Sequence, residues 1–153
     1  MTTYERTART HVDGSPMFSS AEDEANEREV AADLGRAWRC EVHAFGPLTA
    51  LDFYALRDGR LAGVIELRCL RASTTTHESA YLNVRKWLAL TLAQAGLGVP
   101  ALWVVRFVDG IRWIRVGEVD ASAVTMLRRR VVQVASDVEP AIAVPVNSMR
   151  SLP

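Results

Sequence analysis

Residues 51–68, LDFYALRDGRLAGVIELR, have the pattern of two β-strands joined by a tight turn. Aromatic and β-branched side chains occur in both halves, and the segment Arg57-Asp58-Gly59 between them is typical of a reverse turn. We therefore predict two adjacent antiparallel strands, over about Thr49 to Leu56 and over Arg60 to Leu70.

Two acidic residues, Asp52 and Glu66, lie within these strands. Successive side chains of a strand point to opposite faces, so Glu66 and Arg68 share one face. A two-residue turn at Asp58-Gly59 would put Asp52 on the other face from Glu66. A three-residue loop over 57–59 would make the two carboxylates diagonal neighbours on one face. We predict the three-residue loop.

The segments on either side of this hairpin alternate between helical and strand patterns. Apolar residues at helical spacing, after an acidic first turn that suits the helix dipole, predict a helix over about Ala21 to Arg39. A second helix is expected over about Ala80 to Ala95, followed by glycines. Strands are expected over Ala101 to Phe107 and Ile111 to Val116. The tail is expected to pair about Leu127 to Ala135 with Ala141 to Val146.

This order of elements indicates an α/β fold, in which helices flank a mixed sheet with an α-β-β-α-β-β core and a C-terminal hairpin. Strands on either side of a helical crossover run parallel. Residues 1–20 are polar and without periodicity, which predicts a flexible N-terminal arm. The chain has 153 residues, which suits one domain of usual size, and we assign that domain to residues 21–153.

Two carboxylates on neighbouring strands, with main-chain carbonyls nearby, offer the hard oxygen ligands that suit Mg²⁺ or Mn²⁺. A cation held there could activate a water molecule and stabilise a phosphate under attack. Arg68, two residues beyond Glu66, could hold the phosphate. A solvated strand face that carries a Glu66–Arg68 ion pair would explain the same alternation.

An acidic residue on one strand, followed on the next strand by Glu-x-basic and framed by helices, resembles the PD-(D/E)XK nuclease superfamily. The segments LDFYALRDGRLAGVIELR, YLNVRKWLALTLAQAG and VPALWVVRFVDGIRW are similar to small phage and prophage members of that superfamily. The resemblance covers about 90 residues, from Glu27 to Val116. It implies the restriction-endonuclease-like fold and a nuclease activity.

By this resemblance Asp52 and Glu66 are the metal-binding carboxylates, and Glu27 matches an acidic residue of the first helix. The position before the aspartate holds Leu51 where the superfamily has proline. Arg68 stands where it has its catalytic lysine. Arginine keeps the charge but is a poor proton shuttle, because its pKa lies above about 12.

Lys86 is the only lysine of the chain, and it could replace the missing motif lysine. The phage proteins that this chain resembles carry a Lys-aromatic pair at this place, which matches Lys86-Trp87. The resemblance thus implies that Lys86 is catalytic. A surface lysine packed beside Trp87 is the alternative. Tyr81, earlier in the same predicted helix, is a weaker substrate-binding candidate.

The chain carries 18 basic and 18 acidic residues, so its net charge gives no general attraction to nucleic acid. A local basic cluster, Arg128-Arg129-Arg130, could contact a phosphate backbone, although a solvated face is the commoner role. The chain lacks an apolar run of about 20 residues and a glycine-rich phosphate loop. We expect no membrane-spanning segment, and we expect the protein to be located in the cytoplasm of a bacterial host.

The sequence therefore predicts a metal-dependent DNA nuclease of a phage or mobile element, with Mg²⁺ or Mn²⁺ as cofactor. The alternative is a catalytically degraded module of the same fold, which binds nucleic acid or serves a larger assembly. Convergence of Asp52, Glu66 and Glu27 under Lys86 or Arg68 would favour the nuclease. A salt bridge from Arg68 to Glu66 would favour the degraded module. The substrate structure and the oligomeric state, including a homodimer, stay open.

Overall fold

A computed structural model describes residues 7–10, 16–19, 21–46, 48–128 and 138–153. Its centre is a mixed sheet with the strand order β11-β8-β7-β5-β4-β3. In chain order these strands are β3 (Glu41–Ala44), β4 (Phe53–Arg57), β5 (Arg60–Cys69), β7 (Ala101–Phe107), β8 (Gly110–Arg115) and β11 (Arg150–Ser151). The central pair, β5 and β7, is parallel, and the other neighbours are antiparallel.

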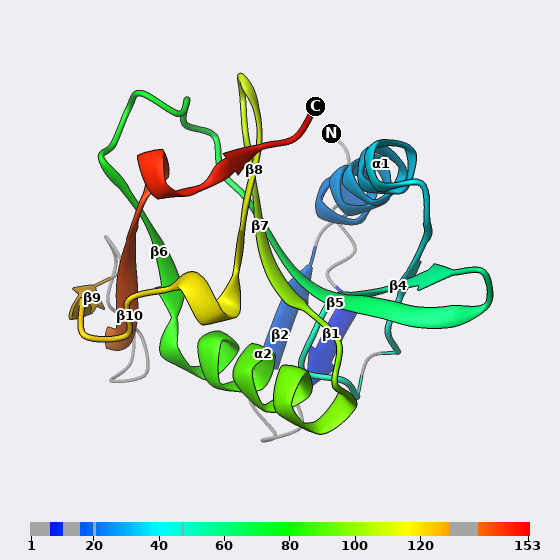
Figure 1. The fold of residues 1–153 in the computed structure, drawn as a ribbon. Helices are drawn as coiled ribbons and strands as arrows, with labels where there is room; N and C mark the ends of the chain where they lie inside the picture. The colour runs from blue at the N-terminus through cyan, green and yellow to red at the C-terminus, as the bar shows by residue number, and fades with distance from the viewer. Residues whose placement is uncertain (1–6, 11–15, 20, 47, 129–137) are drawn as a thin grey trace.

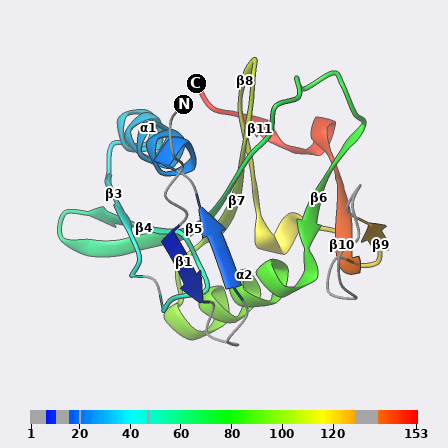
Figure 2. The same ribbon diagram turned by 180° about the vertical axis from the view of Figure 1, so that it is seen from behind.

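Two helices lie on opposite sides of this sheet. Helix α1 (Ala21–Trp38) lies on one side and helix α2 (Val84–Leu97) on the other (Figure 1). The view from behind shows the same two layers with the sheet between them (Figure 2). Because α2 connects β5 to the parallel strand β7, the expected helical crossover is present. The predicted α/β class and the mixed, helix-flanked sheet are confirmed.

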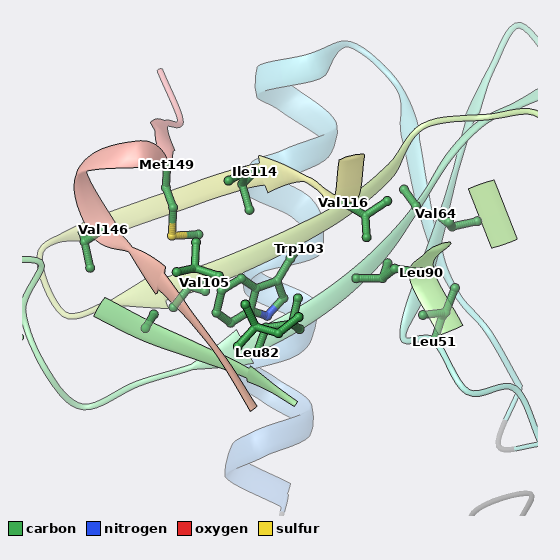
Figure 3. Packing of buried hydrophobic residues seen from close by; sticks show 14 of the residues in the cluster. Leu51, Val64, Leu82, Leu90, Trp103, Val105, Ile114, Val116, Val146 and Met149 are labelled. Carbon is green, nitrogen blue, oxygen red and sulfur yellow. The ribbon is translucent and has the colours of Figure 1, made fainter. Parts of the chain in front are cut away.

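Side chains that alternate along β5 and β7 divide the core into two clusters. Val64, Trp103 and Val105 point toward α2, where they pack with Leu82 and Leu90 (Figure 3). On the other face, a smaller cluster packs beneath α1; its buried members are Val30, Leu34, Phe53, Ile65 and Val104. Strand β5 therefore contributes to both cores, and its polar residue Glu66 lies on the α2 face, beside Val64.

The predicted three-residue loop between β4 and β5 is wrong. Arg57 pairs directly with Arg60, so the turn consists of Asp58 and Gly59, which have φ angles of 52° and 73°. Two consecutive left-handed residues characterise the type I′ turn, whose twist matches that of the strands. A register shift follows, because Leu56 pairs with Leu61 whereas Ala55 pairs with Gly63.

This shift leaves Ala62 as an extra residue in β5, as in a β-bulge. Beyond it Phe53 pairs with Ile65, so Asp52 comes level with Glu66. The bulge thus puts both carboxylates on one face, the arrangement that we had attributed to a longer turn.

The second helix begins four residues later than predicted. Residues Ser79–Asn83 form strand β6, in which Ala80 and Leu82 are buried and Tyr81 is exposed. This alternation with a period of two is that of a strand with one buried face. The side chain of Asn83 accepts a hydrogen bond from the Arg85 amide and caps α2.

Strand β6 belongs to a second, three-stranded sheet of order β6-β10-β9. Strands β9 (Val124–Arg128) and β10 (Val138–Pro145) are antiparallel neighbours, so the expected C-terminal hairpin is present. Its first strand lies earlier than predicted, and residues 129–135 of that prediction lie outside the described residues.

The predicted arm 1–20 contains regular structure in its described part. Strands β1 (Thr7–Thr10) and β2 (Pro16–Ser19) pair as an antiparallel two-stranded sheet. The division of the chain at residue 20 stays a prediction. Among the described helices, none has the length and apolar character needed to cross a membrane.

Candidate active site

Asp52 immediately precedes β4, and its position is fixed by hydrogen bonds from two backbone amides. Its carbonyl oxygen accepts a hydrogen bond from the Phe45 amide at 2.9 Å. Its carboxylate Oδ2 accepts another from the Leu67 amide of β5 at 2.8 Å. The Asp52 carboxylate is therefore fixed against the strand that carries Glu66.

Glu66 is the only charged residue among the buried side chains of the described chain, with 6% of its surface exposed. Its Oε1 atom lies 2.9 Å from the Lys86 ammonium nitrogen. Its Oε2 atom is fully buried and has no hydrogen-bond partner in the part of the chain that the structure describes. A buried carboxylate oxygen without a donor is costly, because it has lost its hydration without replacement.

Lys86 lies in the first turn of α2, which carries it over the α2 face of β5. Its ammonium group contacts Glu66 and also donates a hydrogen bond to the Ala50 carbonyl oxygen at 2.9 Å. The structure therefore brings the chain's single lysine into contact with Glu66 and close enough to affect the pKa of Asp52, and its catalytic role stays a prediction. Lys86 is a partly buried member of an ion pair, with 29% of its side chain exposed, rather than a fully exposed surface lysine.

The two carboxylic acids have raised pKa values. Burial raises the pKa of Glu66 to about 8, with a further contribution from the negative charge of Asp52, while Lys86 opposes the shift. Burial also raises the pKa of Asp52, against the Leu67 amide and the charge of Lys86, which lower it. Two carboxylates that share a buried site resist ionising together, so the site favours binding a positive charge.

This donor set fits a hard divalent cation. Asp52 and Glu66 supply two buried carboxylates. Glu66 Oε2 has no hydrogen-bond donor among the described residues, and a bound cation would give it a partner. No group of three His, Cys, Asp or Glu side chains within the described residues could hold a metal ion. Mg²⁺ commonly binds through one or two carboxylates and keeps several water molecules, so two suffice.

The remaining predicted residues lie around this group rather than within it. Arg68 is exposed on β5, two residues beyond Glu66 and on the same face. Glu27 is a half-buried residue of α1. Burial raises the pKa of Cys69 at the end of β5, and the negative charge of Glu27 adds to this shift. Asp52 also contributes to that shift, so Glu27 lies near the same end of β5.

The substrate-binding candidates are less defined. Tyr81 is exposed on β6, on the side of that strand away from the buried Ala80 and Leu82. Arg128 is the last residue of β9, while Arg129 and Arg130 lie outside the described residues. The roles of Tyr81 and of the three arginines stay predictions.

Sequence reasoning missed two backbone groups of the site, the Leu67 amide and the Ala50 carbonyl. Every residue except proline carries such an amide, and every residue carries a carbonyl, so the sequence contains no signal for which of them face a site. Only the register of β4 against β5 and the position of α2 select these two.

Comparisons with known proteins identify the family and the fold. The model of a family described as "Phage putative PDDEXK endonuclease" matches residues 14–152. Among solved structures, the fold is similar to Hjc from Archaeoglobus fulgidus, a Holliday junction resolvase from an archaeal hyperthermophile. That similarity has a TM-score of 0.58 at 14% identity and covers 86% of this chain and 93% of the other. No curated protein matches the chain by sequence.

Proposed function

Because the chain belongs to the family of phage PDDEXK endonucleases, we propose that it is a metal-dependent DNA nuclease. Its reaction is the hydrolysis of phosphodiester bonds, and its setting is the cytoplasm of a bacterial host. The observation that carries the proposal is the buried pair of Asp52 and Glu66 beneath Lys86. A fold needs no such costly group for stability, so a function is the better explanation.

Asp52 and Glu66 would hold Mg²⁺ or Mn²⁺, and Glu27 would be an outer metal ligand or would orient a water molecule. When bound, the metal would lower the pKa of a water molecule and offset the charge of the phosphate. The Leu67 amide keeps Asp52 oriented toward this position. The raised pKa values mean that the metal-free site holds a proton more readily than ordinary carboxylates do.

Lys86 would supply the positive charge that the motif lysine gives in this superfamily. Its ammonium group is held by Glu66 and the Ala50 carbonyl, so it is positioned before substrate arrives. A fixed cation stabilises the charge that develops on the phosphate. Arg68, exposed on the same face, would bind the phosphate of the strand being cut, and Tyr81 would contact the substrate nearby.

Cleavage assays on a panel of DNA structures test this proposal. The panel contains linear, circular, single-stranded and four-way-junction DNA, each with Mg²⁺, with Mn²⁺ and with chelator. We expect cutting that requires metal and falls at least about 10²-fold in Glu66→Gln, the range seen when a catalytic stabilising group is removed. The four-way junction is included because the resolvase with a similar fold acts on such junctions.

Glu41→Gln is the matched control, because Glu41 is an exposed glutamate of β3 that pairs with His43. It should cut as the wild type does. Cutting that survives in Glu66→Gln would exclude the proposed site. If no protein cuts any substrate with either metal, the proposal is wrong and the chain is a non-catalytic module that binds nucleic acid or serves an assembly. Light scattering of the protein gives its oligomeric state and, together with cleavage of the four-way junction, tests whether the active species is a homodimer.

A further inference from the structure

A small pocket lies on the α1 face of the sheet, where α1 ends and no longer covers the strands. Its volume is about 200 Å³. Ala55 of β4 and Gly63 and Ile65 of β5 are among its lining residues. Ile65 is adjacent in sequence to Glu66 but points to the other face, so the pocket and the candidate active site are separated by the sheet.

The pocket exists because small residues meet there. Ala55 and Gly63 are opposite each other across β4 and β5, beside the extra residue Ala62. Trp38, at the end of α1, and Trp113, on β8, also line the pocket, and both are only half-buried. Their rings make an edge-to-face contact with centroids 5.6 Å apart. Both rings pack at the edge of the smaller core cluster beneath α1, so part of each ring is accessible from the pocket.

Two exposed arginines, Arg57 and Arg115, complete the lining. Arg57 donates a hydrogen bond to the Trp38 carbonyl oxygen at 2.8 Å, which fixes its guanidinium beside the aromatic wall. No carboxylate is among the described residues that line the pocket. The nearby Glu118 forms an ion pair with Arg150 and also accepts a hydrogen bond from the Arg115 backbone amide; the Arg150 guanidinium lies over the Trp113 ring. The two charged side chains that line the pocket are therefore both positive.

We propose that this pocket binds a nucleotide, with its base against the two tryptophans and its phosphate between Arg57 and Arg115. A wall of aromatic and apolar side chains suits a planar ring, and guanidinium groups suit a phosphate. The volume lies below the roughly 300–1,000 Å³ of pockets for drug-sized ligands, so it holds a single ring system. The ligand is either a free mononucleotide or an unpaired nucleotide of a DNA strand.

Tryptophan fluorescence of the full chain, titrated with dAMP in chelator, tests this site directly. The Glu66→Gln variant is used beside the wild type, so that neither metal nor cleavage contributes to the signal. We expect saturable quenching in both, with binding about tenfold weaker in Arg57→Gln and in Arg115→Gln, since each removes a charge-assisted hydrogen bond. Adenosine, which lacks the phosphate, should bind as weakly as dAMP binds to these variants.

Arg60→Gln is the matched control, because Arg60 faces Arg57 across the hairpin but does not line the pocket. It should bind dAMP as the wild type does. Ala62→Leu fills the pocket with a larger side chain and should abolish binding, with a thermal melt to verify that the variant is folded. A parallel titration with blunt duplexes and duplexes with one unpaired terminal nucleotide identifies the source of the ligand.

Preference for the unpaired end, lost in Arg57→Gln, assigns the pocket to DNA, and binding of dAMP alone assigns it to a free nucleotide. The proposal is overturned if neither ligand binds saturably, or if Arg57→Gln and Arg115→Gln bind as tightly as Arg60→Gln does. Every titration runs without metal, so it does not depend on cleavage. The pocket can therefore bind a nucleotide even if the chain cuts no DNA, and the chain can cut DNA even if the pocket binds no nucleotide.

Discussion

Lys86 and Glu66 form an ion pair in which the lysine has a second partner. Glu66 Oε1 and the Ala50 carbonyl each lie 2.9 Å from the ammonium nitrogen, so its position is defined from two sides. The pair is partly shielded from water, and its attraction is stronger than that of an exposed pair. Lys86 thus lies at Glu66, while Arg68 is exposed on β5 two residues beyond it.

Replacing this lysine should remove catalysis and leave the fold. We expect Lys86→Gln to cut DNA about 10²-fold or more slowly under single-turnover conditions, because the fixed positive charge at the phosphate is lost. The fold should persist, since Glu66 can protonate when its partner is gone. Arg85→Gln is the control from the same helical turn, because Arg85 pairs with Glu139 instead. An unchanged rate in Lys86→Gln would exclude a catalytic role.

The raised pKa of Glu66 makes the stability of the metal-free chain depend on pH. The pKa of Glu66 in the folded chain, about 8, exceeds its ordinary value of 4.5, so protonation of Glu66 stabilises the folded state. This contribution is complete below pH 4.5 and is lost as the pH rises through 8. In chelator we expect the melting temperature to fall between pH 5 and pH 9, by roughly 2–4 °C for each kcal/mol lost.

Glu66→Gln identifies the group responsible, because glutamine stays neutral throughout this range. We expect its melting temperature to change less between pH 5 and pH 9 than that of the wild type. Divalent metal should also reduce the dependence in the wild type, since it stabilises the ionised carboxylates. Equal slopes for the wild type and Glu66→Gln in chelator would show that Glu66 is not the titrating group.

The β4–β5 hairpin shows how an element can reach the expected arrangement by another route. The pattern of residues 51–68 predicts the two strands, although β4 begins at Phe53 rather than at about Thr49. Both carboxylates lie on one face, as predicted. The turn is shorter than predicted, and the extra residue is Ala62 within β5. Composition predicts that a turn lies at Arg57–Gly59, but the choice between turn and bulge depends on strand twist and on packing across the sheet.

The turn itself offers a test of this description. Gly59 has a φ angle of 73°, and a Cβ there would contact nothing within 4 Å. Gly59→Ala should therefore destabilise the chain by about 1 kcal/mol, through backbone conformation alone. Gly46→Ala is the matched control, because Gly46 has equal space and no positive φ. Thermal melts of both variants measure this, and equal melting temperatures would contradict the turn type.

Elements with a strong pattern are predicted within a residue or so. Helix α1 ends at Trp38 rather than Arg39, and β7 spans Ala101–Phe107 as expected. Strand β6 was predicted as the start of a helix, because four residues are too few to establish a period. Its strand conformation comes from pairing with β10, about 60 residues later, which no local pattern contains.

Across the whole molecule, the site could be predicted only in its side chains. The resemblance names Asp52 and Glu66, and the single lysine draws attention to Lys86, yet the contacts of all three depend on distant backbone. The Leu67 amide of β5 donates to the Asp52 carboxylate beside the neighbouring strand β4. Lys86 of α2 donates to the carbonyl oxygen of Ala50, which lies 36 residues earlier in the chain. These partners follow from register and packing, which are properties of the complete fold.

The charge of the whole molecule predicts how DNA binding responds to salt. The net charge is zero, and several described arginines are already paired with carboxylates, at Arg36, Arg85, Arg106 and Arg150. Proteins that make 6–10 phosphate contacts lose about 10³–10⁵ in affinity between 50 and 200 mM salt. We expect a loss below about 10² for Glu66→Gln, measured by fluorescence anisotropy in chelator.

The basic cluster at residues 128–130 should account for part of that salt dependence. If Arg129 contacts a phosphate, Arg129→Gln should reduce the slope of log affinity against log salt by about one unit. Arg36→Gln is the control, because Arg36 is paired with Asp33 on α1 and should leave the slope unchanged. A slope that both variants share with the parent would remove the cluster from the DNA interface. The few remaining contacts would then belong to Arg68 and Lys86, so that binding and cleavage would depend on the same residues.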